Sequence, residues 1–149
     1  MAEVWFYHLE KQPLDHVLPR IVTSSLARGW RMVIETAVPE RIAKLSEILW
    51  ASEDVAFLPH GFEGEPSPED QPVWLTASSE NPNNAQVRVL LDGAKPADIS
   101  MLMRAVLMFD GNNDQAVEAA RTEWKIQKSA GHDISYWKQD ENGKWQNQA

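Results

Sequence analysis

The sequence predicts a single α/β domain in three layers, in which a mostly parallel central sheet carries helices on both faces. The chain has 149 residues, which is the usual size of one compact domain. Short runs of bulky apolar residues alternate along it with segments whose apolar residues recur at helical spacing. Such alternation is typical of strands joined by crossover helices. We expect residues 1–149 to form one domain, with residues 136–149 adding a C-terminal hairpin.

The first part of the chain predicts a strand, a helix and a strand. Residues 4–9 form a continuous bulky run, as in a strand that is covered on both faces. Residues 17–26 follow with apolar side chains at helical spacing, and Gly29 stands where a helix often ends. Pro19 inside this stretch predicts either a kink or a later helix start. Residues 30–34 then return to strand character.

A second helix and a long loop come next. Pro39-Glu40 opens a helix with one apolar stripe that ends near residue 50 or 51. Residues 55–58 are a further candidate strand. Residues 52–72 contain six acidic side chains, no Lys or Arg, four closely placed prolines after residue 58 and two glycines, so we expect a loop there.

The third part predicts two short strands and one ambiguous run. Residues 73–76 and 87–91 are strand-like, and the turn sequence at 80–84 separates them. Residues 99–109 are apolar and rich in methionine, and we interpret them as a helical turn followed by a strand at 105–109.

The last part predicts a helix and a hairpin. The helix runs from about residue 114 to 130, with Asn113 or Asn112 as its N-cap and Gly131 as its terminator. A final strand is expected at 134–137, after which the turn 140–143 lets residues 144–146 pair back.

The composition excludes several classes of protein. The formal net charge is −8, which opposes direct binding to nucleic acid. The absence of cysteine excludes disulfides, thiolate metal sites and cysteine nucleophiles. Neither a leader nor a membrane span is predicted, so we expect a cytoplasmic protein.

Motifs for nucleotide, cofactor or metal binding are not found in the sequence. The first strand is followed by Glu10-Lys11-Gln12-Pro13 rather than by closely spaced glycines, and no two histidines have the spacing of a metal clamp. We therefore expect no cofactor. His60 follows Pro59 at the end of the candidate strand 55–58, a usual place for functional groups. An alternative function is therefore a small α/β enzyme that acts near His60 and the 59–72 loop.

The helix at 114–130 has two distinctive faces. Its small and apolar residues predict the face that packs on the sheet: Ala116, Ala119, Ala120, Ile126 and Ala130. Nearly opposite, an outward stripe combines three cations with an indole: Val117, Arg121, Trp124, Lys125 and Lys128. One interpretation is an ordinary solvated face. The other is a binding site for a short acidic peptide with an apolar anchor.

Several motifs, in order along the chain, resemble the chi subunit family of bacterial DNA polymerase III. They are FYHL at 6–9, LARGW at 26–30, LW at 49–50, FLPH at 57–60, GE at 64–65, PVWL at 72–75, ARTEWK at 120–125 and AG at 130–131. The resemblance implies a non-enzymatic adaptor of the clamp loader, with a fold like nucleotide-binding domains but without a nucleotide site.

In this family, one surface binds the acidic C-terminal tail of single-stranded DNA-binding protein, which ends in Pro-Phe. The resemblance places that site at Arg121, Trp124 and Lys125, inside the outward stripe, with tryptophan where tyrosine is familiar. A separate surface contacts the psi subunit or a helicase partner. Its matching positions are Trp50 and Phe57, with Pro59 and His60 nearby. The resemblance therefore favours protein partners and no direct contact with nucleic acid or membrane.

Overall fold

A single mixed sheet organises the protein. The structure is a computed structural model that describes residues 2–10, 13–51, 60–96 and 99–148. Its strands are β1 (Glu3–Leu9), β2 (Met32–Thr36), β3 (Gly61–Phe62), β4 (Val73–Thr76), β5 (Val87–Leu91), β6 (Arg104–Asp110), β7 (Asp133–Gln139) and β8 (Trp145–Asn147). Its helices are α1 (Leu14–Ala27), α2 (Ile42–Trp50) and α3 (Asp114–Ser129), with short 3-10 turns η1 (Pro39–Arg41) and η2 (Pro68–Asp70).

The eight strands lie in the order β3-β4-β2-β5-β6-β1-β7-β8. Every neighbouring pair is parallel except β7 and β8, which form an antiparallel hairpin. The chain leaves β1 through α1 to reach β2, and it leaves β6 through α3 to reach β7. Because β1 and β6 are neighbours and their crossovers run in opposite directions, this pair is the topological switch point of the sheet.

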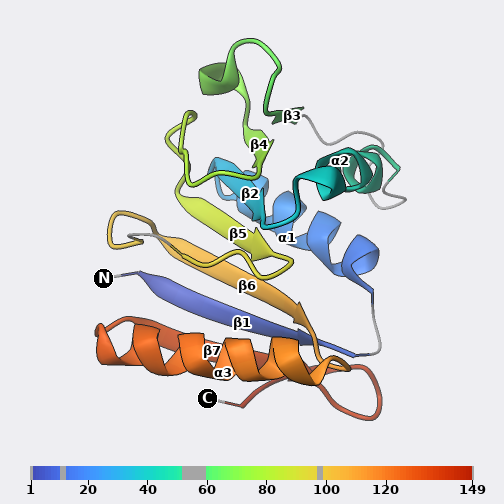
Figure 1. Ribbon diagram of the computed structural model, residues 1–149, viewed down its shortest axis with the longest axis vertical. Coiled ribbons are helices and arrows are strands. Elements are labelled where there is room, and N and C mark those ends of the chain that lie inside the picture. Colours follow the sequence, from blue (N-terminus) through green and yellow to red (C-terminus); the bar gives the residue numbers. More distant parts are fainter. Residues whose placement is uncertain (1, 11–12, 52–59, 97–98, 149) are drawn as a thin grey trace.

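Helices cover both faces of the sheet, which confirms the predicted three-layer class (Figure 1). On one face, side chains of α1 and α2 form a core with Tyr7, Met32 and Ile34. On the other face, Ala120 of α3 packs with Val4 and Phe6. The alternate residues of β1 thus point to opposite cores, as the two-residue period of a strand requires.

The sequence places most elements within a few residues. The bounds of β4 and β5 are as predicted, and Asn113 is the N-cap of α3. Helix α1 begins at Leu14, directly after Pro13, so the later start considered for this helix is wrong and Pro19 lies inside it. The carbonyl oxygen of Pro19 accepts a hydrogen bond from the Thr23 hydroxyl (2.8 Å).

Three further predictions need correction. The strand expected at 30–34 begins only at Met32, because the backbone N–H of Trp30 still donates to the carbonyl oxygen of Ser25 at the end of α1 (3.1 Å). The loop expected at 52–72 contains the short strand β3 and the turn η2. Residues 100–101 form a simple turn of the backbone, and not the turn of helix that the sequence suggests. The candidate strand 55–58 lies outside the described residues.

Candidate functional site

Helix α3 carries the outward stripe and is fixed at its start by a cap. The Oδ1 atom of Asn113 accepts hydrogen bonds from the backbone N–H groups of Gln115 (3.0 Å) and Ala116 (3.1 Å). This satisfies two of the N–H groups that a helix start otherwise leaves unpaired. The helix then lies in front of β7 (Figure 1) and contacts β6, β1 and β7.

The predicted inner face of α3 is only partly correct. Ala120 is buried, but Ala119, Ala130 and Ile126 are exposed. Gln127 is buried instead, because its side-chain amide donates to the carboxylate of Glu123 one turn earlier (2.9 Å). The buried face is therefore rotated toward the stripe, so that the stripe borders it rather than lying opposite. Trp124 consequently packs partly against the core beside Ala120.

This rotation places part of the stripe at a cavity of 450 Å³ between α3 and the end of the sheet. Arg121, Trp124 and Lys125 form its α3 wall. The remaining lining comes from β1, β7 and the C-terminal segment: His8, Tyr136, Lys138 and Gln148. We call this space the α3–β7 cavity. It combines cationic groups on two walls with exposed aromatic surface, which suits an acidic ligand that has an apolar end.

The cationic side chains of the stripe have different local partners. Arg121 forms an ion pair with Glu118 one turn earlier (3.2 Å), and both side chains are largely exposed, at 65% and 71%. The ammonium of Lys128 lies 4.6 Å from the centroid of the Trp124 ring. Exposed ion pairs of this kind are weak, so Arg121 can exchange Glu118 for a carboxylate of a ligand.

His8 and Tyr136 form the floor of the α3–β7 cavity and belong to a hydrogen-bonded chain that ends at Glu10. The buried imidazole of His8 contacts the Tyr136 hydroxyl through Nδ1 (2.9 Å) and the Glu10 carboxylate through Nε2 (2.7 Å). An ionised carboxylate can only accept, so Nε2 carries a proton, and in the corresponding neutral tautomer Nδ1 accepts from the Tyr136 hydroxyl. A Cβ atom at Gly111 would lie within 2.2 Å of the His8 ring. Only glycine therefore allows the chain to pass here after β6.

Two acid–base groups in this set of hydrogen bonds, Glu10 and Tyr136, have shifted pKa values. The hydrogen bond from His8 lowers the pKa of Glu10, and the nearby Lys138 adds to this effect. Burial raises the pKa of the Tyr136 phenol, which the positive charge of Arg121 partly counteracts. At neutral pH Tyr136, which lines the cavity, is therefore neutral, and Glu10, which lies behind His8, is charged.

The structure brings together three of the five stripe residues and adds others that the sequence reasoning missed. Val117 and Lys128 do not line the α3–β7 cavity, although Lys128 supports Trp124 from outside. His8 and Lys138 were not predicted, and they are register partners in the parallel pair β1–β7. The spacing of Tyr136 and Lys138, two residues apart, was a usable signal for a shared strand face, but it could not place that face beside α3.

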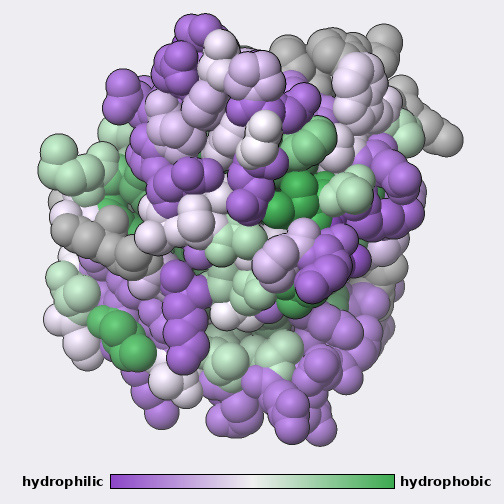
Figure 2. All heavy atoms as spheres, turned by 45° about the horizontal axis from the view of Figure 1, so that its top comes forward, coloured by the Kyte–Doolittle hydropathy of each residue, from purple (hydrophilic) through white to green (hydrophobic). Residues whose placement is uncertain are grey.

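The second predicted surface, around Trp50 and His60, is described in part. Trp50, the last residue of α2, is 56% exposed, which excludes a core position for this side chain. The imidazole of His60 meets its ring edge-on (centroids 5.6 Å apart) and lies 2.8 Å from the Ser46 hydroxyl through Nε2. Phe57 and Pro59 lie outside the described residues. On the face seen in Figure 2, hydrophobic side chains lie in separate groups among hydrophilic ones.

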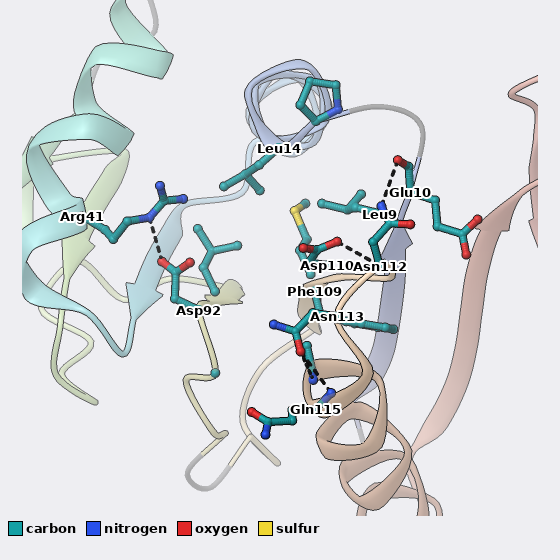
Figure 3. A pocket seen from close by; sticks show the side chains of 15 residues that line it. Leu9, Glu10, Leu14, Arg41, Asp92, Phe109, Asp110, Asn112, Asn113 and Gln115 are labelled. Atoms are coloured by element: carbon teal, nitrogen blue, oxygen red, sulfur yellow. Dashed lines mark hydrogen bonds and ion pairs between the residues drawn. The ribbon is translucent and has the colours of Figure 1, made fainter.

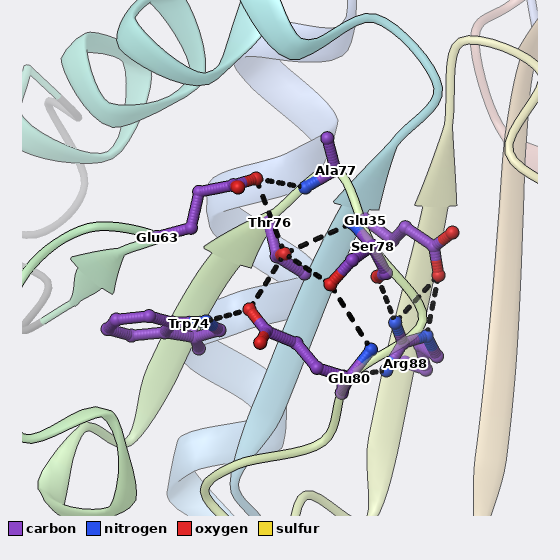
Figure 4. A network of polar contacts seen from close by, with 8 residues as sticks. All are labelled: Glu35, Glu63, Trp74, Thr76, Ala77, Ser78, Glu80 and Arg88. Carbon is purple, nitrogen blue, oxygen red and sulfur yellow. Dashed lines mark hydrogen bonds and ion pairs between the residues drawn. The ribbon is translucent and has the colours of Figure 1, made fainter.

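The Ser46–His60 contact and the acidic loop bear on the alternative of an enzyme. The Ser46 side chain is buried, and neither Ser46 nor His60 lines any of the three cavities described for this protein. Glu63 of the loop accepts hydrogen bonds from Thr76 and from the backbone of Ala77 (Figure 4). Glu63 thus ties the loop to the end of β4, and the Ser46 hydroxyl joins His60 to α2.

The same part of the sheet contains a buried ion pair. Arg88 of β5 binds the Glu35 carboxylate of β2 through Nη2 (2.7 Å) and Nε (2.9 Å). It also donates to the carbonyl oxygens of Ser78 and Glu80 (2.7 Å each; Figure 4). This network fixes the segment between β4 and β5, on the part of the sheet remote from α3.

A larger cavity of 710 Å³ lies at the switch point, at the carboxyl ends of β1, β5 and β6 (Figure 3). Nucleotides bind at this place in related sheet topologies. Here the rim carries the carboxylates of Glu10, Asp92 and Asp110, which repel phosphate. Arg41 is already paired with Asp92 (3.3 Å), and Asn113 occupies the N–H groups at the start of α3. The geometry therefore favours the prediction that no nucleotide binds.

Within the described ranges, no group of three or more His, Cys, Asp or Glu side chains is arranged to hold a metal ion. In the same part of the chain, no helix combines the length and apolar character needed to cross a membrane.

The fold and the α3–β7 cavity together define an α/β domain of the doubly wound class with a cationic cavity beside its last helix. The chain belongs to the DNA polymerase III chi subunit (HolC) family, whose family model matches residues 1–135. Members of this family are non-catalytic accessory subunits of that polymerase.

One curated relative is similar over much of the chain. It is the probable DNA polymerase III subunit chi of Rickettsia prowazekii (strain Madrid E), which is 28% identical over 104 residues. The match covers 70% of this chain and 61% of the Rickettsia protein. The chain thus spans about three fifths of the length of the relative that it matches.

Proposed function

We propose that this protein is a replication adaptor that binds the acidic C-terminal tail of single-stranded DNA-binding protein and links it to the DNA polymerase III clamp loader. The observation that carries the proposal is the α3–β7 cavity, in which Arg121, Lys125 and Trp124 face the same space. Two cations suit the acidic side chains of the tail, and the indole suits its terminal phenylalanine. The place of action would be the replisome in the cytoplasm.

The charge of the protein supports recognition of a protein tail rather than of DNA. A net charge of −8 opposes the counterion release that drives binding to bare DNA. The cations of the stripe are local, on one helix, whereas a single-strand groove needs basic and aromatic side chains across the domain. Contact with coated single strands would thus pass through the protein tail.

The second surface supports a link to another subunit. Trp50 presents more than half of its side chain to solvent beside His60, and exposed aromatic side chains are frequent anchors of protein interfaces. We assign this surface, with the sequence positions Phe57 and Pro59, to the psi subunit or to another clamp-loader or helicase partner.

The test is fluorescence anisotropy with a labelled peptide of acidic residues ending in Pro-Phe. Arg121→Ala should weaken binding about tenfold, because a charge-assisted hydrogen bond to the peptide is lost. Lys44→Ala is the matched control, since Lys44 also pairs with an acid three residues away, Glu47 (3.7 Å), but on α2, on the other face of the sheet. Equal binding by Arg121→Ala and the unaltered protein would place the tail site elsewhere. Equal binding of a peptide without the final Phe would show that the terminal phenylalanine does not anchor the peptide.

A further inference from the structure

The wall of the α3–β7 cavity that faces α3 comes from a segment beyond the residues matched by the family model. That match ends at residue 135, whereas Tyr136, Lys138 and Gln148 line the cavity. The three residues belong to the hairpin of β7 and β8 and to the segment that follows it. This inference rests on the proposed function, because it concerns the same cavity.

The hairpin is held firmly in place. Strand β7 pairs in parallel with β1, so that Lys138 lies opposite His8, and it pairs in antiparallel fashion with β8. The backbone N–H of Gln148 donates to the carbonyl oxygen of Tyr136 (2.6 Å), and the backbone N–H of Tyr136 donates to Asn147 Oδ1 (3.2 Å). A wall that is ordered before binding costs less entropy when a ligand enters.

Lys138 is the cation of this wall, and its present partner is already engaged. Its ammonium lies 3.7 Å from Oε1 of Glu10, the atom that His8 also contacts at 2.7 Å. The side chain of Lys138 is 43% exposed. A long, exposed ion pair is weak. The ammonium can therefore leave Glu10, whose carboxylate keeps the hydrogen bond from His8.

We propose that the β7–β8 hairpin is a working part of the peptide site, and that Lys138 determines its preference for acidic peptides by binding a peptide carboxylate. Arg121 and Lys125 then hold the peptide from α3 while Lys138 holds it from the facing wall. Cations on both sides of the cavity select a chain with several carboxylates over one with a single acid, because each wall needs its own partner.

The experiment compares Lys138→Gln with Lys144→Gln in the full chain, using the labelled acidic peptide ending in Pro-Phe. Lys144 lies in the same hairpin, is exposed and does not line the cavity, so its loss changes the net charge equally. Lys138→Gln should weaken binding about threefold to fivefold at low salt, and Lys144→Gln should leave it unchanged. The difference should shrink as salt is added, since exposed charges are screened.

Two further arms sharpen the result. Glu10→Gln removes the carboxylate that competes for Lys138 and should strengthen binding, the opposite direction to Lys138→Gln. A peptide with a C-terminal amide shows whether Lys138 binds the terminal carboxylate, in which case Lys138→Gln no longer matters, or an acidic side chain, in which case its effect persists.

The outcomes separate this inference from the proposed function. Unchanged affinity in Lys138→Gln, with weakened affinity in Arg121→Ala, would overturn the role of the hairpin and leave the adaptor function standing. Equal losses in Lys138→Gln and Lys144→Gln would reduce the effect to net charge and also overturn it. If the unaltered protein does not bind the peptide, the proposed function itself fails.

Discussion

The Tyr136 hydroxyl lies 2.9 Å from Nδ1 of His8, and this hydrogen bond joins β7 to β1 at the floor of the α3–β7 cavity. His8 is 7% exposed, so its ring nitrogens have little access to water. This hydrogen bond therefore has two roles. It satisfies a ring nitrogen of the buried imidazole, and it positions the aromatic ring of Tyr136 beside the proposed peptide site.

Tyr136→Phe should destabilise the fold while keeping the ring in place. The substitution leaves Nδ1 of His8 without its hydrogen-bond partner, and a buried unsatisfied polar atom costs about 1 to 3 kcal/mol. Urea unfolding measures this loss, and the pattern of ¹⁵N shifts of His8 reports whether the Nε2–H tautomer persists. Unchanged stability together with an unchanged tautomer would show that the hydrogen bond does not hold the floor.

Glu118→Gln should strengthen peptide binding about twofold to threefold, since Glu118 competes with the ligand for Arg121 (3.2 Å). Glu141→Gln is the matched control, because Glu141 is an exposed acid in the hairpin turn, away from the stripe. Anisotropy titrations of both variants give the comparison. The same gain in both would mean that only the net charge matters.

Arg88→Met should lower the free energy of unfolding far more than Arg41→Met does. The Arg88 and Glu35 side chains are only 7% and 12% exposed, so the substitution leaves a buried carboxylate without its partner, at a cost of about 3 to 5 kcal/mol. Arg41 and Asp92 are more exposed, and their pair contributes less than about 1 kcal/mol. Urea unfolding of the two variants tests this order, and similar losses would contradict it.

The parts of the fold that the sequence predicts well are those determined by local patterns. The cap at Asn113 and the bounds of β4 follow from residues next to one another in the chain. Strand β3 has only two residues, too few to show a period. The inner face of α3 was misjudged because Gln127 is buried through a hydrogen bond to Glu123, which hydropathy alone does not indicate.

The candidate site divides in the same way. The α3 wall could be predicted, because Arg121, Trp124 and Lys125 share one helix face. The facing wall could not, because it depends on the pairing of β1 with β7, which brings His8 next to Lys138 across most of the chain. Nothing in either segment alone specifies that pairing.

Trp50→Ala should abolish capture of a clamp-loader partner while leaving the affinity for the acidic peptide unchanged. Trp50 is exposed at the end of α2, so little stability is lost with its side chain, whereas an interface anchor typically contributes about 2 kcal/mol or more. Co-purification with the psi subunit, or with the clamp-loader or helicase partner, measures the first effect and anisotropy the second. Joint loss of both activities would indicate one continuous surface instead of two.

Glu10 should make the stability of the protein depend on pH in the acid range. Its folded-state pKa is lowered below the ordinary value of 4.5, chiefly by the hydrogen bond from His8. The folded state therefore favours the ionised form, and the resulting stabilisation is fully present above pH 4.5. It is lost as the pH falls through the lowered folded-state pKa.

The stability difference between the unaltered protein and Glu10→Gln should accordingly be constant near neutrality and shrink in acid. Urea unfolding at several pH values measures it, with Glu141→Gln as the exposed control. A difference that does not change with pH would show that Glu10 acts through packing and not through its charge.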